Sequence, residues 1–202
     1  MESLPYFVKD CRNTWPDERH YLSAEQELVA YWRQRLSDKN NFCVAIYWEG
    51  NPKTDKKRDI PLPMFGLLAS VPGVKFWSLQ QGKATLNIRK QNWRHLIEDL
   101  GPQIDQSDAF VDSAAILRNA DLLISSDTGM AHLAGALGTP VWILLRKLPD
   151  FRWLKADAEQ SLYPSMRTFR QNDEGDWHSV MAEVGRELGI LVHKSRIGLK
   201  KA

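Results

Sequence analysis

The sequence has few cysteines, no long apolar run and almost no net charge. Its two cysteines, Cys11 and Cys43, form neither a disulfide framework nor a zinc-ligand pattern. The longest apolar runs, near residues 42–48 and 141–145, are far shorter than the ~20 residues that a membrane-spanning helix needs. The first ten residues, MESLPYFVKD, lack the basic and apolar regions of a secretory signal. These absences predict a cytoplasmic protein without a membrane span or a disulfide scaffold.

The composition is that of an ordinary globular domain. The 202 residues are 43% hydrophobic and 26% charged, which excludes wholesale disorder. The 27 Lys+Arg nearly balance the 25 Asp+Glu, giving a formal charge of +2, so a dedicated nucleic-acid binder with a strongly basic face is not expected. We predict a lead-in segment over residues 1–22, one folded domain over residues 23–192 and a basic, frayed tail over residues 193–202.

Short apolar runs alternate with helical patterns along the predicted domain. The strand-like runs are residues 42–48, 74–80, 121–125, 140–145 and 166–170. The helical patterns are residues 23–36, where Ser23 and Gln26 have capping-box spacing, and residues 61–69, 86–100, 112–119, 128–137 and 177–188. This alternation predicts an α/β fold, a Rossmann-like doubly wound parallel sheet with helices on both faces. Ligands bind such sheets beside the carboxyl ends of the strands, near the topological switch point.

The turn between the third strand and its helix is the first candidate site. There the chain runs through Ser125-Ser-Asp-Thr-Gly129. The first N–H groups of a helix have no internal partner, and the helix dipole adds about half a positive charge, which together favour a phosphate. Gly129 has no Cβ to hold a ligand away from the backbone. Thr128 and His132 are four residues apart and reach the same end of the helix. With Asp127, they form a candidate anion site.

Each of these residues also has a structural interpretation. Asp127 is a good helix N-cap, a lone helical histidine is often only packed or solvated, and Gly135 allows close packing of the helix on the sheet. The tripeptide Asp127-Thr-Gly also occurs in aspartic proteases, which pair two carboxylates. Those proteases are all-β, whereas this tripeptide opens a helix between two predicted parallel strands, and the sequence has no second copy.

Two other strand ends carry polar residues. The loop after the first strand contains Gly50 and Asn51, which permit tight turns and close approach of the backbone, and four cations, of which Arg58 can form a bidentate contact with a diphosphate. The second strand ends at Gln80 and Gln81, whose amides can both donate to and accept from a nucleobase edge. A solvated surface loop and a polar strand end are the alternative interpretations.

These residues give the sequence its resemblance to a known family. It resembles the donor-binding half of a GT-B glycosyltransferase, and is most similar to glycosyltransferase family 9, the heptosyltransferase-like group that includes members fused to tetratricopeptide repeats. The main motif is Ser126-Asp-Thr-Gly-Met-Ala-His-Leu-Ala-Gly-Ala-Leu-Gly-Thr-Pro-Val141. Weaker support comes from Trp48-Glu-Gly-Asn-Pro52, Arg58-Asp-Ile-Pro61, Val71-Pro-Gly-Val-Lys-Phe-Trp-Ser-Leu-Gln80 and Pro149-Asp-Phe-Arg-Trp153. The similarity covers about residues 23–190.

The resemblance implies roles for the candidate residues. Around the diphosphate and sugar of a nucleotide-diphosphate-sugar donor it places Asp127, Thr128, Gly129 and His132. It places Arg58 against the phosphates, and Gln80 or Gln81 near the base or ribose. Fixed donors there stabilise the nucleoside diphosphate as it leaves. The family generally needs no divalent metal, so no cofactor or metal site is expected, and no catalytic residue is assigned.

The sequence departs from the family in two ways. GT-B enzymes have two Rossmann-like halves, and the acceptor site and usually the general base belong to the N-terminal half. Only about 40 residues precede the first predicted strand here, too few for that half. Arg146 and Lys147 stand where the family has apolar or aromatic residues. Either a partner chain completes the enzyme, or the chain is a truncated or degenerate member, or it binds its donor without turnover. We therefore predict a donor-binding glycosyltransferase domain whose acceptor-binding half comes from elsewhere. The alternative is a non-catalytic nucleotide-binding or protein-interaction module.

Overall fold

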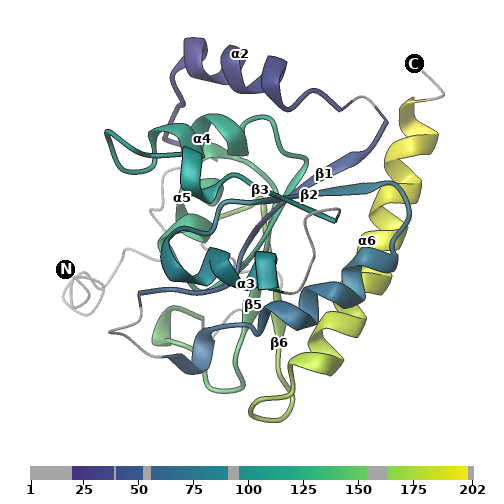
Figure 1. The fold of residues 1–202 in the computed structure, drawn as a ribbon. Helices are drawn as coiled ribbons and strands as arrows, with labels where there is room; N and C mark the ends of the chain where they lie inside the picture. Colours follow the sequence, from purple (N-terminus) through teal and green to yellow (C-terminus); the bar gives the residue numbers. More distant parts are fainter. Residues whose placement is uncertain (1–19, 39, 52–55, 91–95, 154–162, 200–202) are drawn as a thin grey trace, which may run out of the picture.

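A six-stranded parallel sheet forms the centre of the chain (Figure 1). The computed structural model describes residues 20–38, 40–51, 56–90, 96–153 and 163–199. The strands lie in the order β3-β2-β1-β4-β5-β6, and every neighbouring pair is parallel. Their bounds are β1 Phe42–Tyr47, β2 Val74–Ser78, β3 Ile97–Asp99, β4 Leu122–Ser126, β5 Val141–Leu145 and β6 Met166–Arg170.

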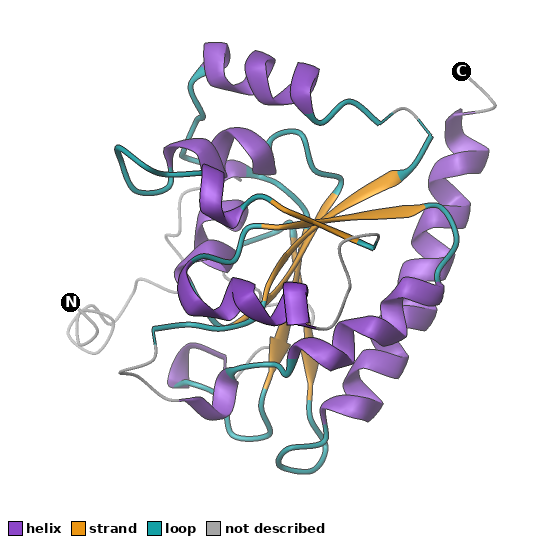
Figure 2. Cartoon of the chain, in the orientation of Figure 1, coloured by secondary structure: helices purple, strands orange, loops and turns teal. Residues whose placement is uncertain are grey.

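Helices cover both faces of this sheet (Figure 2). The α-helices are α2 Gln26–Arg35, α3 Leu86–Lys90, α4 Val111–Leu117, α5 Gly129–Leu137 and α6 Trp177–Leu199. Short 3₁₀ helices occur at η1 Lys56–Arg58, η2 Leu62–Ser70, η3 Gly82–Thr85, η5 Gly101–Gln103 and η6 Phe151–Trp153. Within the described ranges, none of these helices combines the length and apolarity needed to cross a membrane.

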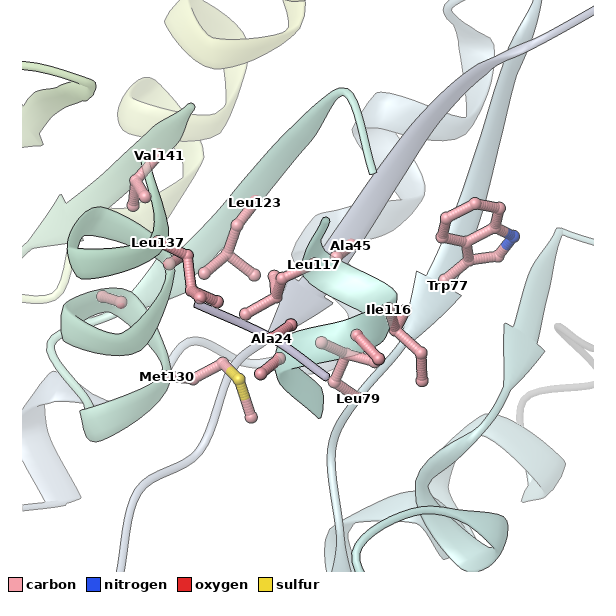
Figure 3. Packing of buried hydrophobic residues seen from close by; sticks show 14 of the residues in the cluster. Ala24, Ala45, Trp77, Leu79, Ile116, Leu117, Leu123, Met130, Leu137 and Val141 are labelled. Atoms are coloured by element: carbon pink, nitrogen blue, oxygen red, sulfur yellow. The ribbon is translucent and has the colours of Figure 1, made fainter. Parts of the chain in front are cut away.

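The two faces of the sheet bury two separate hydrophobic clusters. Along β1, Cys43 and Ala45 belong to the cluster under α2, α4 and α5, and Val44 and Ile46 belong to the cluster under η2 and α6. Figure 3 shows part of the first cluster, in which Leu117 and Leu137 meet over the sheet. Because both faces are covered, the central strands are continuous apolar runs rather than alternating ones. This pattern is what made them recognisable in the sequence.

The chain changes direction across the sheet between β1 and β4. It first extends outward from β1 through β2 to β3, and then returns to place β4 directly beside β1, with Val44 opposite Leu122. The segments that follow β1 and β4 therefore leave the same edge of the sheet, at the switch point. The predicted fold, a Rossmann-like doubly wound parallel sheet with helices on both faces, is confirmed.

One predicted helix is wrong in part. Residues 86–100 were expected to form one amphipathic helix, but α3 is short, residues 91–95 lie outside the described chain, and residues 97–99 form β3. Ile97 pairs with Phe76 of β2 and is buried. A three-residue edge strand is too short to show alternation, so its apolar residues merged with the helical pattern before it.

Three other predicted helices differ from the structure in their type or in where they end. The segment at residues 61–69 is the 3₁₀ helix η2. Helix α2 begins at Gln26 without a side-chain cap, because Tyr21 and Leu22 donate their N–H groups to Ala136 O and hold the preceding segment on α5. The capping box expected at Ser23 is therefore absent. Helix α6 continues to Leu199, so residues 193–199 of the predicted frayed tail are helical.

Candidate functional site

The turn after β4 presents an uncapped helix terminus. Thr128 is the N-cap residue of α5 and is extended, but no side chain of the described chain caps the helix. Thr128 Oγ1 instead lies 3.1 Å from Ser125 Oγ. The structural interpretation of Asp127 as the N-cap is therefore wrong. Asp127 and Thr128 are buried while Gly129 is exposed. The Ala131 N–H already donates to Thr128 O at 3.1 Å, so the Gly129 amide is the one at the start of α5 that an anion could reach.

The loop after β1 folds back and places Arg58 on a glycine. Ile60 donates its N–H to Trp48 O at 3.0 Å, and the Gly50 N–H donates to Asp59 Oδ1 at 3.0 Å. A Cβ on Gly50 would lie 2.8 Å from Arg58 Nη2 and 3.2 Å from Arg58 Cζ. The guanidinium therefore occupies the space that any other residue at position 50 would fill. Residues 52–55 of this loop, which include one predicted cation, lie outside the described chain.

Arg58 and Asp127 meet in one pocket at the switch point. The pocket has a volume of about 70 Å³ and is lined by Arg58, Asp127, Leu145, Arg146, Pro149 and Asp150. Asp150 accepts a charge-assisted hydrogen bond from Arg152 Nε at 2.9 Å. The predicted juxtaposition of the Arg58 loop and the Asp127 turn is thus observed. The lining thus combines two arginines, whose guanidinium groups suit a group of phosphate size, with two aspartates.

Sequence reasoning missed Arg146. It treated this residue only as a departure from the family pattern, whereas the structure places its side chain in the pocket with Arg58. The available signal was its position directly after β5, because the carboxyl ends of neighbouring parallel strands share one edge.

Of the two predicted glutamines, Gln80 has its amide occupied by the backbone. Gln80 is buried, and its Oε1 accepts the N–H groups of Trp48 and Glu49 at 3.0 and 2.9 Å while its Nε2 donates to Glu49 O. This amide extends the backbone pairing beyond β1 and is not directed at a base, so the interpretation of Gln80 as a ligand contact is corrected. Gln81 Nε2 donates to Asp105 Oδ2 at 3.2 Å on the surface. Asn51 is exposed.

His132 lies in an aromatic cluster beside the pocket. Its ring stacks on Trp153 at 5.6 Å between centroids, and its Nδ1 is 3.4 Å from Tyr163 Oη. Burial lowers the pKa of His132, and the charge of Arg152 lowers it further, against the opposing effect of Asp127. The imidazole is therefore neutral near pH 7. His132 is not one of the residues that line the described pocket.

Phe110 is a second residue that the sequence did not reveal. Its backbone has a φ of 70°, a left-handed conformation that is rare outside glycine, and its side chain is 46% exposed. A Cβ built on Gly129 would lie 3.7 Å from Phe110 Cζ, so the ring stands at the start of α5. No sequence pattern predicts a strained backbone at a phenylalanine.

Part of the chain matches a known family. Residues 76–148, which contain the Asp127 turn and Arg146, match the model of glycosyltransferase family 9 (heptosyltransferase). The resemblance to family 9 is confirmed. Arg58 and the loop after β1 precede the segment that matches family 9.

Longer proteins share the sequence or the fold of the chain. Protein FlbA of Caulobacter vibrioides is 27% identical over 186 residues, which are 90% of this chain and 31% of FlbA. E. coli ADP-heptose LPS heptosyltransferase II has the same fold, with a TM-score of 0.64 and 13% identity over 91% of this chain and 55% of the enzyme. A family 9 glycosyltransferase from Veillonella parvula gives a TM-score of 0.57 and 13% identity over 87% of this chain and 53% of its own. The chain thus spans about half of the two solved proteins and under a third of FlbA.

Proposed function

We propose that this chain binds the diphosphate of a nucleotide-sugar donor for glycosyl transfer. The observation that carries the proposal is the shared pocket of Arg58 and Asp127 at the switch point, beside the uncapped start of α5. As the glycosidic bond breaks, negative charge grows on the departing nucleoside diphosphate. Fixed cations and amides directed at that charge lower the barrier.

Each part of the pocket has a proposed role. Arg58 and Arg146 hold the phosphate oxygens from opposite sides, since a guanidinium donates in a fixed fork. The exposed amide of Gly129 binds the same oxygens. Asp127, which is acceptor-only when ionised, takes sugar hydroxyl groups. In this proposal the diphosphate is held by cations and an amide and needs no metal.

The size of the pocket sets the position of the rest of the donor. A volume of about 70 Å³ is well below the roughly 300–1,000 Å³ of pockets that enclose a whole small-molecule ligand. We therefore place only phosphate inside it. The exposed ring of Phe110 at the start of α5 is the aromatic surface on which the base or sugar would stack. The acceptor and the general base would come from an acceptor-binding half outside the described chain.

Titration calorimetry with ADP, UDP and GDP tests the proposal. At least one nucleotide should bind with a dissociation constant below about 1 mM, and excess ligand should raise the melting temperature by mass action. Loss of one charge-assisted contact costs about 1.5–3 kcal/mol, so Arg58→Ala or Arg146→Ala should weaken binding roughly ten- to hundredfold. His132→Ala should also weaken it, and Asp127→Ala should weaken binding of a whole nucleotide-sugar, whose sugar hydroxyl groups it takes.

A neighbouring cation supplies the matched control. Lys57 precedes Arg58 in η1, but its Nζ pairs with Glu174 at 3.0 Å on the surface. Lys57→Ala removes the same charge and should leave the affinity within about twofold, because exposed ion pairs are worth little. Equal loss in Lys57→Ala and Arg58→Ala would show attraction by net charge alone, without a built pocket. No binding of any nucleotide would overturn the proposal.

The exposed aromatic residues Tyr21 and Tyr31 favour a second candidate, a protein-interaction module. In that case the three nucleotides would not bind, and Asp127→Ala would have no effect on capture of a partner. Tyr31→Ala would reduce it, since large aromatic residues dominate binding energy at protein interfaces.

A further inference from the structure

A chain of hydroxyl contacts leads from the surface to His132. Tyr21 Oη is 3.3 Å from Tyr163 Oη, and Tyr163 Oη is 3.4 Å from His132 Nδ1. Tyr21 is 62% exposed, while Trp153, on the other side of the imidazole, is fully buried. The imidazole is thus held between an indole face and a phenol. Such contacts restrict both its orientation and the position of its proton.

Tyr163 packs against α5 at Gly135, where the absence of a side chain leaves room for it. A Cβ at position 135 would be 2.4 Å from Tyr163 Cγ and 3.0 Å from Tyr163 Cβ. These atoms are close to the tyrosine backbone and cannot swing aside as the end of a flexible side chain can. Gly135 follows His132 by three residues in α5, so the two lie on one face of the helix. Glycine inside a helix costs about 1 kcal/mol relative to alanine, and the close approach of Tyr163 explains its presence.

The position of the imidazole proton depends on whether Nδ1 donates to or accepts from Tyr163. A neutral imidazole has one donor nitrogen and one acceptor nitrogen, and the tautomer is set by what faces them. Tyr163 Oη lies within hydrogen-bond distance of both Tyr21 Oη and His132 Nδ1, and the tautomer decides which atom donates to which. If the phenol of Tyr163 donates to Nδ1, the proton of the ring is on Nε2. His132 Nε2 is buried and has no hydrogen-bond partner among the described residues.

We infer that Tyr163 is a positioning residue that holds His132 with an N–H at Nε2 for the phosphate of the donor. This inference rests on the proposed function, because the phosphate oxygen is the partner that the buried Nε2–H lacks. Asp127 and Asp150, which line the pocket, both act electrostatically on His132. A neutral N–H donor adds a hydrogen bond to the anion without adding a third charge. Because Tyr163 packs directly against Gly135, the fold itself fixes this orientation of the His132 imidazole.

Imidazole ¹⁵N NMR together with ADP titration tests the inference. The wild-type chain should show the tautomer protonated at Nε2, and Tyr163→Phe should shift His132 to a tautomer mixture and weaken ADP binding about fivefold, the factor equivalent to ~1 kcal/mol for one hydrogen bond. Tyr21→Phe removes only the outer hydroxyl and should change neither result. In a His132→Gln background, Tyr163→Phe should cause no further loss, because the two residues act as one unit.

The outcomes separate this inference from the proposed function. If the wild-type chain binds none of the nucleotides, the proposed function fails, and the inferred role toward phosphate fails with it whatever the tautomer. If ADP binds but the wild-type proton is on Nδ1, or Tyr163→Phe alters neither tautomer nor affinity, the inference alone is overturned. Gly135→Ala is the second variant, since it displaces Tyr163 with its hydroxyl intact. It should reproduce the tautomer shift of Tyr163→Phe, and an unchanged tautomer in a folded Gly135→Ala chain also overturns the inference.

Discussion

Substitution of Gly50 by alanine separates the position of Arg58 from its charge. The added Cβ would lie 2.8 Å from Arg58 Nη2 and 3.1 Å from Nε. The guanidinium must retreat by roughly 0.6 Å to reach the 3.4 Å at which ordinary contact begins. The clash is with the end of a flexible side chain, so the fold should tolerate it. We expect the free energy of unfolding to change by less than about 1 kcal/mol, within the range of ordinary surface substitutions.

The same change should reduce nucleotide affinity. Misplacing a positioned group by ~1 Å can cost as much as a hundredfold, so a shift of this size, with the charge retained, should weaken ADP binding about fivefold. Calorimetry on Gly50→Ala beside Arg58→Ala measures the effect, and the second variant should lose more. Gly189→Ala is the matched control, because its Cβ meets nothing within 4 Å in α6. That variant should gain up to about 1 kcal/mol of stability and bind ADP normally.

Three results would refute this reasoning. If Gly50→Ala binds ADP as the wild type does while Arg58→Ala does not, Arg58 is not held by its contact with Gly50. If both variants bind normally, the guanidinium takes no part in nucleotide binding. A large loss of stability in Gly50→Ala would show that the loop backbone, rather than the guanidinium, gives way.

Three other changes test separate parts of the structure. Gln80→Leu leaves the buried N–H groups of Trp48 and Glu49 without an acceptor and should lower the free energy of unfolding in urea by about 2–4 kcal/mol, whereas Gln81→Ala at the surface should change it by less than about 0.5 kcal/mol. Because burial lowers the pKa of His132 below its ordinary 6.5, stability should be full above that pH and fall as the pH drops through it. His132→Gln should flatten this decline in melting temperature, and His178→Gln, at an exposed position, should not. Phe110→Ala should weaken nucleotide binding about fivefold if the ring stacks on the base or sugar, and Phe110→Gly should in addition stabilise the fold by relieving the positive φ; unchanged affinity in both would remove Phe110 from the site.

The sequence was sufficient for the architecture because the central strands are buried on both faces. Such strands are short apolar runs, and the helix that follows β4 ends at Gly138 with the positive φ expected of a C-terminal glycine. The edge strand β3 could not be found, because three residues carry no periodicity. The missing cap at Ser23 depends on a long-range contact, the hydrogen bonds from Tyr21 and Leu22 to Ala136 O. Local spacing contains no information about that contact.

The candidate site shows the same division between local and long-range information. The Asp127 turn was visible because a strand end and a helix start occur together in the sequence, and the switch-point rule predicted that the Arg58 loop would face it. The role of Gln80 was not visible, because an amide beside a strand end is equally suited to a ligand and to a neighbouring backbone. Only the structure shows that its acceptor is used by Trp48 and Glu49. Arg146 and Tyr163, the two further residues of the proposed site, follow β5 and precede β6, at places that no local motif connects to Asp127.

Under the proposed function, binding and turnover have different structural requirements. The groups proposed to hold the diphosphate come from the ends of β1, β4 and β5, which are adjacent strands of one sheet. Their relative positions are fixed by the core on both faces, so the chain by itself should bind a nucleotide with the full effect of Arg58 and Arg146. Transfer also needs an acceptor and a base, and the chain spans only about half of the heptosyltransferase fold. Measurements of nucleotide affinity can therefore test the roles of Arg58, Arg146 and Tyr163 without the acceptor half.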